Sequence, residues 1–354
     1  MNMVKITLND TVAKLKEKSK AKNTQDKYEG DWLKFTNYCQ NKYLCNPLDV
    51  DDLESAYALT ANYMDWLHED PEAKVFKGSS NIPGREKLNN NPYSSSPYKA
   101  STIQRILASI TYKYRLNGFQ FDRKNPNIAE TISAIVRDEK NNKSGQAKEL
   151  LKADIIKIID TIPSDEEDYS NIRDKALILI GFYSFCRRSE LLGMQFEHLN
   201  FGNDGVQVLI PFSKTDQTGE GRMILLPATN DDYCPVRALK HWLEIAMIEN
   251  GPLFYKINKS NTIEKYTMNY KNQKVSLNDS SFVLILKKRA LAAGLENCDK
   301  ISGHSLRIGS ITQARMNGVP TYEIMAQSGH KTTQMIDRYT KLSNIKETSA
   351  AKKI

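Results

Sequence analysis

The sequence predicts a mainly α-helical chain of two domains, with a small antiparallel β-hairpin in the C-terminal domain. Apolar residues recur at helical spacing through most of the 354 residues. Only residues 205–227 carry the alternating, β-branched pattern of a hairpin. Residues 138–148 are polar, charged and contain glycine, which is typical of a linker. We therefore expect an N-terminal helical domain at 1–137, a second domain at 149–342 and a polar tail at 343–354.

The N-terminal domain is expected to be a small helical bundle behind a basic arm. Residues 1–22 carry six lysines and two acidic residues. This composition is typical either of a solvated arm or of an arm that contacts phosphates. Proline, serine, asparagine and glycine gather in residues 70–99, which we expect to form a long loop. Amphipathic periodicity predicts helices at 23–39, at 49–67, at 100–117 and from Pro126 onwards.

The second domain is expected to pack helices and the hairpin around one buried helix. Residues 176–186 form the longest apolar run of the chain, which suits the interior of a domain. The hairpin strands, 205–212 and 222–227, are joined by a turn that holds Lys214. The remaining elements are predicted as helices at 150–162, 234–248 and 276–293, a short strand at 253–255, and three short helices within 302–342.

Composition narrows the class of protein. The formal net charge of +8 favours a polyanionic partner. A membrane span needs about 20 apolar residues, so the run at 176–186 is too short and we expect no membrane partner. The five cysteines are scattered without a CxxC pair, and GxxxxGK[ST] and HExxH motifs are absent. We therefore expect a protein of a reducing, intracellular compartment, without a disulfide framework, a zinc site or an ATP site.

Residues 302–342 gather side chains that suit an anion. His304 and Arg307 are three residues apart, so they share a face if a helix starts there. His330 follows a glycine break, and Tyr339 lies on the next helical stretch. Two imidazoles, a guanidinium and a phenol can bind an anion and offer it a nucleophile. The sequence alone therefore suggests a phosphodiester as the anion to test.

Two further cations lie upstream. Arg187 and Arg188 follow the apolar run directly, which would hold a guanidinium on a rigid element. They can equally be read as cations that stabilise a helix C-terminus. Lys214 lies near the tip of the hairpin, where it either reaches a phosphate or is simply solvated.

Taken together, these residues resemble the tyrosine recombinase, or phage integrase, family. Residues 24–35 also resemble the first helix of its core-binding domain, with a T-x-x-x-Y-x-x-x-W-x-x-F pattern. His330 follows Arg307 by 23 residues, and Tyr339 follows His330 by nine. The matching pieces are R-x-S-E-L at 187–191, Lys214 in the hairpin turn, H-x-x-R at 304–307, Gly329-His330 and Tyr339.

The resemblance implies how a DNA strand would be cut. Tyr339 would attack the scissile phosphate and form a 3′-phosphotyrosyl link. Lys214 would protonate the leaving 5′ oxygen as a general acid. Arg222 is the nearest basic alternative to Lys214, beyond the hairpin loop. Tyr322 is a competing phenol, but it precedes Gly329-His330 and is expected to be structural.

The resemblance also implies how the phosphate would be held. Arg187 and Arg307 would bind its non-bridging oxygens, which suit forked donors. His304 and His330 would add hydrogen bonds, and His304 would help to manage the tyrosine proton. Glu190 would support Arg187. Counting back from the Ser-Glu-Leu of the first box selects Arg187, not Arg188, as the catalytic arginine.

The function implied by the resemblance is site-specific DNA recombination or integration for a mobile element or virus. A two-domain DNA clamp, made of a helical core-binding domain and a catalytic domain, would act on double-stranded DNA. Four protomers would assemble on two DNA sites, without metal, ATP or another cofactor. Such an enzyme would work with DNA in the cytoplasm or the nucleus, depending on the host. The alternatives are a type IB topoisomerase-like or telomere-resolving strand transferase, and a catalytically silent DNA-binding relative.

Overall fold

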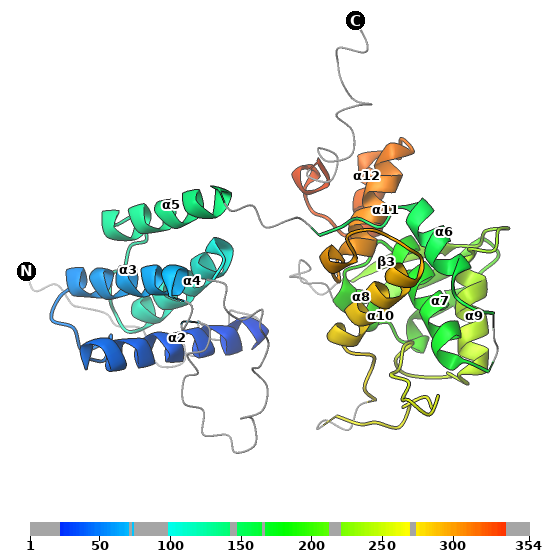
Figure 1. Ribbon diagram of the computed structural model, residues 1–354, viewed down its shortest axis with the longest axis horizontal. Helices are drawn as coiled ribbons and strands as arrows, with labels where there is room; N and C mark the ends of the chain where they lie inside the picture. The colour runs from blue at the N-terminus through cyan, green and yellow to red at the C-terminus, as the bar shows by residue number, and fades with distance from the viewer. Residues whose placement is uncertain are drawn as a thin grey trace, which may run out of the picture. The chain divides into compact units, whose positions relative to one another are not determined.

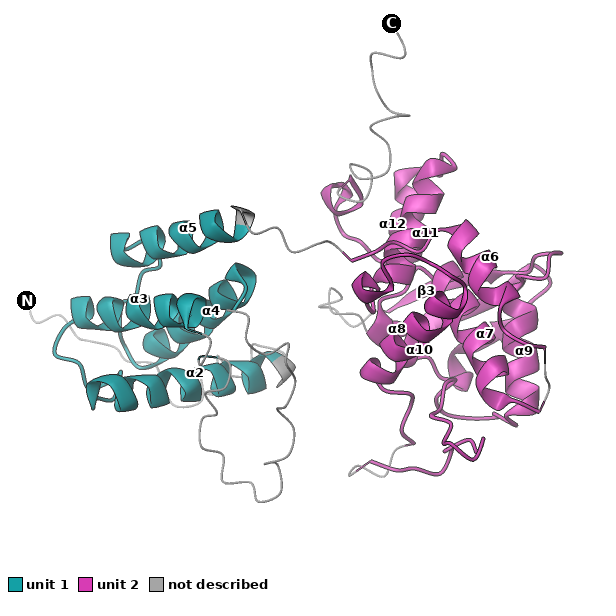
Figure 2. Ribbon diagram, viewed as in Figure 1, with its two compact units in different colours: residues 1–144 teal, residues 145–354 magenta. Residues whose placement is uncertain are grey.

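The chain divides into two compact units, residues 1–144 and residues 145–354 (Figure 2). Each unit has a hydrophobic core of its own. The fold is mainly α-helical with one small antiparallel sheet, so the predicted fold class is confirmed. This computed structural model describes residues 22–70, 73, 98–141, 147–164, 167–211, 221–269 and 274–337.

Unit 1 is a helical bundle in which α2 packs against α4 and α3 packs against α5 (Figure 1). Asp52 begins α3 by accepting a hydrogen bond from the Ser55 backbone N–H at 2.6 Å. The α5 helix continues past Arg137, where the linker was expected to begin. The described helices of this unit are α2 (Lys22–Tyr43), α3 (Leu53–Glu69), α4 (Ala100–Leu116) and α5 (Pro126–Asn141).

Aromatic side chains fill the core of unit 1. Tyr114 stacks on Phe121 with ring centroids 4.8 Å apart, and Phe35 and Tyr63 pack beside them. All four side chains are fully buried. Phe35 of α2 therefore belongs to the core, and Trp32 is half-buried at the edge of this cluster.

Unit 2 surrounds the buried helix α7 with helices and a three-stranded sheet of order β1-β2-β3 (Figure 1). The predicted hairpin is present: Val208 pairs with Ile224 in an antiparallel register. Strand β1 was not predicted, and residues 253–255 form no strand although all three are buried. The described elements are α6 (Lys152–Asp160), α7 (Tyr169–Tyr183), α8 (Arg188–Leu192), β1 (Leu199–Phe201), β2 (Gly205–Ile210), β3 (Arg222–Pro227), α9 (Pro235–Ile245), α10 (Asp279–Ala292), α11 (Ser305–Met316) and α12 (Thr321–Ser328).

Close backbone approaches hold α11 in place within unit 2. A Cβ added at Gly309 would lie 1.8 Å from the backbone oxygen of Leu150, so only glycine fits there. A Cβ added at Gly181 of α7 would lie 2.6 Å from the Leu306 side chain. The N-terminal part of α11 is therefore packed closely between α7 and the segment that precedes α6. None of the helices in the described ranges is both long and apolar enough to cross a bilayer.

A buried ion cluster ties α7 to α10. Asp174 accepts hydrogen bonds from Arg173 Nη2 at 2.6 Å and from Arg289 Nε at 2.8 Å. Arg289 also donates to the Asn171 side chain at 2.8 Å. All four residues are buried, so each charge depends on its partners for solvation.

Replacing Asp174 with Ala should destabilise unit 2 strongly, because two buried guanidinium groups would lose their shared carboxylate. We expect a loss of about 3–5 kcal/mol in the free energy of unfolding. Urea titration followed by far-UV circular dichroism measures this loss. Asp232→Ala, at an exposed position, serves as the control. A loss below about 1 kcal/mol for Asp174→Ala would contradict the importance assigned to the cluster.

Candidate active site

Arg187 lies at the sharp turn between α7 and α8. Phe185 adopts a left-handed backbone conformation, with φ of 56°, and so redirects the chain after α7. Arg187 then caps the start of α8 in an extended conformation. Its backbone N–H donates to Glu190 Oε2 at 3.0 Å and its Nη1 donates to Glu190 Oε1 at 2.7 Å. One carboxylate therefore fixes both the backbone and the guanidinium of Arg187.

Glu190 is shared with a second arginine, Arg222 at the start of β3. Arg222 Nη2 donates to Glu190 Oε2 at 2.8 Å. Burial disfavours the charged carboxylate, but the hydrogen bonds and charges of Arg222 and Arg187 outweigh it and lower the pKa of Glu190. Glu190 is therefore an ionised, buried bridge between two guanidinium groups.

Arg307, in the first turn of α11, connects two other segments. Its Nη1 donates to the backbone oxygens of Phe185 at 2.6 Å and Ser328 at 2.9 Å. Its Nη2 lies 2.9 Å from His330 Nε2. Arg307 therefore joins the α7–α8 turn to the end of α12, and its buried guanidinium has a fixed orientation.

His330 follows the end of α12 and is buried among charged neighbours. Ser328 Oγ lies 2.7 Å from His330 Nδ1. For Arg307 to donate to Nε2, the imidazole must carry its proton on Nδ1 and donate it to Ser328 Oγ. Burial, followed by the charges of Arg307, Arg187 and Arg222, lowers the pKa of His330 to about 4. The imidazole is therefore neutral near pH 7.

His304 lies at the rim of the same region. It caps the start of α11, one turn before Arg307, and its side chain is exposed. Its backbone N–H donates to Ser302 Oγ at 3.2 Å. Lys214 and Tyr339 lie outside the described residues.

The site thus joins residues from four separate parts of the sequence. Arg187, Arg307 and His330 are held in one hydrogen-bonded and electrostatic cluster with Glu190 and Arg222. Sequence reasoning considered Arg222 only as a substitute for Lys214. The need for a second cation follows from the burial of Glu190, which only the structure shows.

The other phenol that the sequence offered lies on the surface. Tyr322 on α12 is 71% exposed. Its neighbour Glu323 raises the pKa of Tyr322 through a hydrogen bond and its charge, which opposes formation of a phenolate. Tyr322 was expected to be structural, but its exposed side chain gives that expectation no support from burial.

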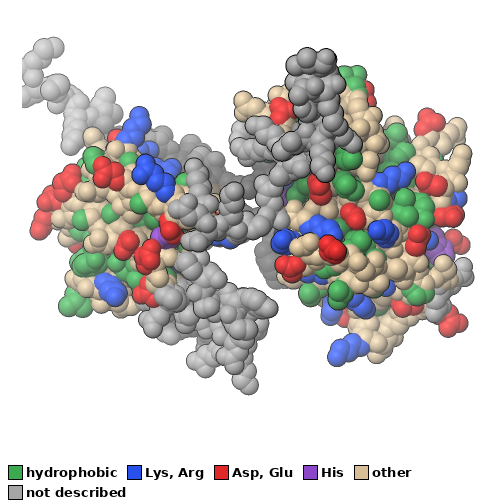
Figure 3. Space-filling view, turned by 45° about the horizontal axis from the view of Figure 1, so that its top comes forward, with side chains coloured by type: hydrophobic (Ala, Val, Ile, Leu, Met, Phe, Trp, Pro, Cys, Tyr) green, Lys and Arg blue, Asp and Glu red, His purple; other side chains and the backbone are tan. Residues whose placement is uncertain are grey.

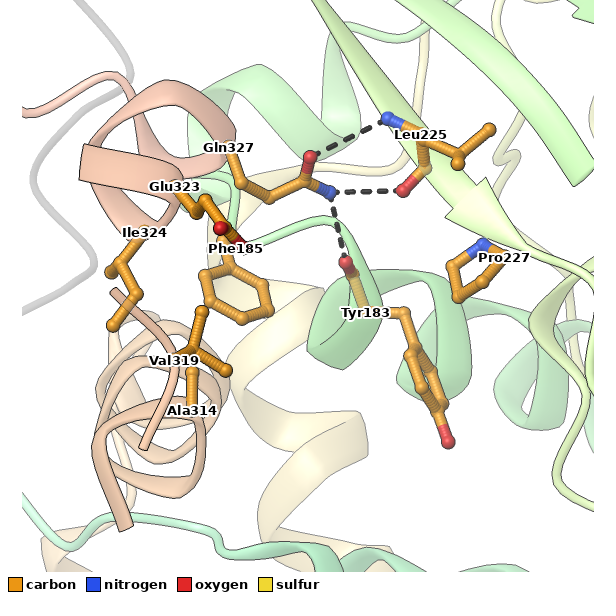
Figure 4. A pocket seen from close by; sticks show the side chains of 9 residues that line it. All are labelled: Tyr183, Phe185, Leu225, Pro227, Ala314, Val319, Glu323, Ile324 and Gln327. Atoms are coloured by element: carbon orange, nitrogen blue, oxygen red, sulfur yellow. Dashed lines mark hydrogen bonds between the residues drawn. The ribbon is translucent and has the colours of Figure 1, made fainter. Parts of the chain in front are cut away.

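The end of α12 is clamped to β3 and α7 by Gln327 (Figure 4). Its Nε2 donates to the backbone oxygens of Leu225 at 2.9 Å and Tyr183 at 3.2 Å. Its Oε1 accepts from the Leu225 backbone N–H at 3.4 Å. Below this clamp lies a mainly apolar cavity of about 320 Å³, lined by Phe185, Ile324 and their neighbours. The clamp fixes the helix that leads into Gly329 and His330.

Surface charge is mixed on the face drawn in Figure 3. Lysine and arginine side chains are scattered among acidic ones over both units, without a single basic patch on this face. Within the ranges described, no group of three histidine, cysteine, aspartate or glutamate side chains is placed to hold a metal ion.

Comparison with known proteins decides the family. Residues 148–345 match the model of the phage integrase family. An integrase/recombinase xerD homolog from Selenomonas ruminantium is 33% identical over 334 residues, which cover 93% of this chain and 84% of the relative. The chain belongs to the phage integrase family of tyrosine recombinases. The family predicted from the sequence is confirmed, and with it the class of enzyme, a tyrosine-type DNA recombinase.

A more distant curated relative and a solved structure are also similar to this recombinase. The tyrosine recombinase XerA of Pyrococcus furiosus is 21% identical over 249 residues, covering 70% of this chain and 71% of the relative. The solved structure of the Tn1549 transposon integrase with transposon right end DNA aligns with a TM-score of 0.53 and 13% identity. That alignment covers 93% of the recombinase and 92% of the solved chain. At this identity the likeness shows the fold alone.

The recombinase should lose stability in acid through His330. The neutral imidazole contributes stability that is fully present above pH 6.5, the ordinary pKa, and is lost as the pH falls through about 4. The gap between these pKa values corresponds to on the order of 3 kcal/mol. His330→Gln should remove this part of the acid sensitivity.

Urea unfolding of both proteins at several pH values between 7 and 4 measures the difference. The free energy of unfolding should fall more steeply with decreasing pH in the wild type than in His330→Gln. Equal slopes would show that His330 titrates normally in the folded chain.

Proposed function

We propose that this chain is a site-specific recombinase that cleaves and rejoins double-stranded DNA through a 3′-phosphotyrosyl intermediate on Tyr339. One observation carries the proposal. Arg187 and Arg307, 120 positions apart in sequence by their numbers, are both fixed within one buried cluster beside the neutral His330. Two preorganised guanidinium groups suit a phosphodiester, whose transition state concentrates charge on its non-bridging oxygens.

The histidines are proposed to complete the binding of the scissile phosphate. His304 is exposed one turn before Arg307, where a phosphate held by that arginine is within reach of the same helix end. The neutral imidazole of His330 adds hydrogen bonding and brings no charge that would repel the two guanidinium groups. In this proposal Glu190 holds Arg187 and does not touch the DNA.

The chemical step is assigned from sequence spacing. The Tyr339 oxygen would give its proton to His304 and attack phosphorus, so that a new O–P bond forms and the bond to the 5′ oxygen breaks. Lys214 would transfer a proton to that departing oxygen. Religation would reverse both steps, with a 5′ hydroxyl displacing the tyrosine. The phosphotyrosyl bond conserves the energy of the cleaved linkage, so neither ATP nor a metal ion is required.

The proposed partners are double-stranded DNA and further copies of this chain. The solved Tn1549 transposon integrase, which has the same fold, is bound to transposon right end DNA in one structure and to circular intermediate DNA in another. We propose by analogy that this recombinase serves a mobile element or a virus. Exchange between two duplexes requires cleavage of four strands, for which four protomers on two sites supply one nucleophile each.

The proposed chemistry predicts a covalent adduct. The full-length protein should form an SDS-stable complex with a member of a library of nicked duplexes whose inverted-repeat arms are randomised. The nick lets the 5′ fragment diffuse away, so the phosphotyrosyl link accumulates. Tyr339→Phe should bind the selected duplex and form no adduct, whereas Tyr322→Phe should form it normally. An adduct that survives in Tyr339→Phe would contradict the assignment.

The proposed phosphate contacts predict different roles for two neighbouring arginines. Arg187→Lys keeps the charge and loses the fork, so the single-turnover cleavage rate should fall by about 100-fold. Arg188→Lys should change that rate by less than about threefold, because Arg188 pairs with Asp279 and packs on Gly303. Affinity for the selected duplex should stay nearly constant in both variants. The reverse order of the two effects would show that the first box is misassigned.

A further inference from the structure

We infer that Arg222 is a positioning residue of the active site. It holds Glu190 and, through Glu190, Arg187. It also fixes the position of the turn that carries His330. This inference rests on the proposed function, because it concerns how the same site is assembled. Arg222 begins β3, directly after the hairpin loop, and its side chain is only 15% exposed.

The first contact is the shared carboxylate. Glu190 Oε1 accepts a hydrogen bond from Arg187 Nη1. Glu190 Oε2 accepts hydrogen bonds from Arg222 Nη2 at 2.8 Å and from the Arg187 backbone N–H at 3.0 Å. The Glu190 side chain is 3% exposed. A buried carboxylate with hydrogen bonds on both oxygens has little freedom to rotate, so it transmits the position of β3 to Arg187.

The second contact is with the end of α12. Gly329 has a φ of +69°, and a Cβ added there would lie 2.9 Å from Arg222 Nη1, 3.0 Å from Cζ and 3.1 Å from Nε. The guanidinium therefore occupies the space that a side chain at position 329 would need. Arg222 Nε also lies 3.4 Å from the Gln327 backbone oxygen, with geometry for a hydrogen bond. His330 follows this packed glycine directly.

Strand β3 thus contacts the end of α12 at two points. The backbone of Leu225 is hydrogen-bonded to the Gln327 side chain (Figure 4). Arg222 packs on Gly329 and its Nε lies within hydrogen-bond distance of the Gln327 backbone oxygen. On the other side of the guanidinium lie Glu190 and the thiol of Cys186, whose Sγ is 3.6 Å from Nη2. One side chain therefore links β3, α8 and the turn before His330.

A direct chemical role suits Arg222 less well. A guanidinium keeps its proton at any physiological pH, which makes it a poor general acid. Its Nη2 contacts Glu190 and Cys186, its Nε faces Gln327, and Gly329 lies against it. These contacts hold the guanidinium among Glu190, Gln327 and Gly329, as a positioning role requires.

The charges around Glu190 make the inference testable by pH. Arg187 from the cap of α8 and Arg222 from β3 act on Glu190 directly. Glu190 also interacts with Cys186 and His330, and Arg307 from α11 influences both of these. Burial opposes ionisation of Glu190, and Arg222 is the strongest opposing influence. Burial also raises the pKa of Cys186 to about 11, so the thiol stays neutral. Without Arg222, Glu190 should protonate at a higher pH.

The deciding experiment is a double-mutant cycle on the full-length protein. Arg222→Gln and Glu190→Gln are compared, singly and together, in single-turnover cleavage of the nicked duplex selected with the wild type. Each single change should slow cleavage by about 100-fold through misplacement of Arg187. The double variant should be no slower than the slower single variant, because both changes break the same link.

Three outcomes in the cleavage rates would overturn the inference. Multiplicative losses in the double variant would show that Arg222 acts on the DNA itself. A wild-type rate in Arg222→Gln would show that it positions nothing. Restoration of Arg222→Gln to the wild-type rate by a 5′-bridging sulfur, a leaving group that needs no proton, would show that it is the general acid.

The pH profile separates positioning from a general loss of folding. Cleavage by Arg222→Gln should gain a steep decline towards acid pH as Glu190 protonates, and the double variant should lack that decline. Arg222→Lys, which returns a charge without the fork, should recover part of the rate and remove the decline. A wild-type profile in Arg222→Gln would contradict the link to Glu190. Arg237→Gln on α9, an exposed arginine bound to a backbone oxygen, is the control.

A measurement without DNA keeps the inference separate from the proposed function. Carbon-13 NMR of glutamate carboxyl groups, with Glu190→Gln to identify the signal, gives the pKa of Glu190 in each folded variant. It should lie below the ordinary value in the wild type and above it in Arg222→Gln. An unchanged Glu190 pKa would overturn the inference even if the wild type forms no adduct, whereas a missing adduct alone counts against the proposed function.

Discussion

The site depends on one buried carboxylate. Glu190 is buried, and the cost of removing its charge from water is offset because Arg187 and Arg222 both form ion pairs with it. Each partner lies on a different element, so the ion cluster also determines how α8 and β3 meet. The same contacts hold the Arg187 guanidinium in one orientation before any ligand arrives. Preorganised donors of this kind stabilise developing charge without having to reorganise during the reaction.

Packing in the rest of unit 2 places Arg307 and His330 next to that cluster. Gly309 and Gly181 let α11 sit close to the Leu150 segment and to α7, which fixes the helix start where Arg307 lies. Arg307 then satisfies two backbone oxygens and meets the imidazole of His330. Because arginines surround this imidazole in a buried place, it stays neutral. The site is thus rich in donors while its positive charge resides on the arginines.

Local sequence patterns predicted much of the fold and pointed to the motif residues. They did not predict contacts between residues that are distant in sequence. Amphipathic periodicity placed the helices to within a few residues, since each is an independent local signal. Strand β1 has only three residues, and the buried run at 253–255 lacks any periodicity that tells a strand from a buried segment. The Arg222–Glu190 pair crosses 32 positions, and the pKa of His330 reflects arginines from three elements. Neither can be read from spacing.

The central claim is that Tyr339 attacks DNA that the arginine cluster holds. The most direct test is mass spectrometry of the wild-type adduct after digestion with protease and nuclease. We predict a nucleotide remnant on the peptide that contains Tyr339, attached through a 3′ phosphate. A remnant on Tyr322 or on any serine, or attachment through a 5′ phosphate, would contradict it.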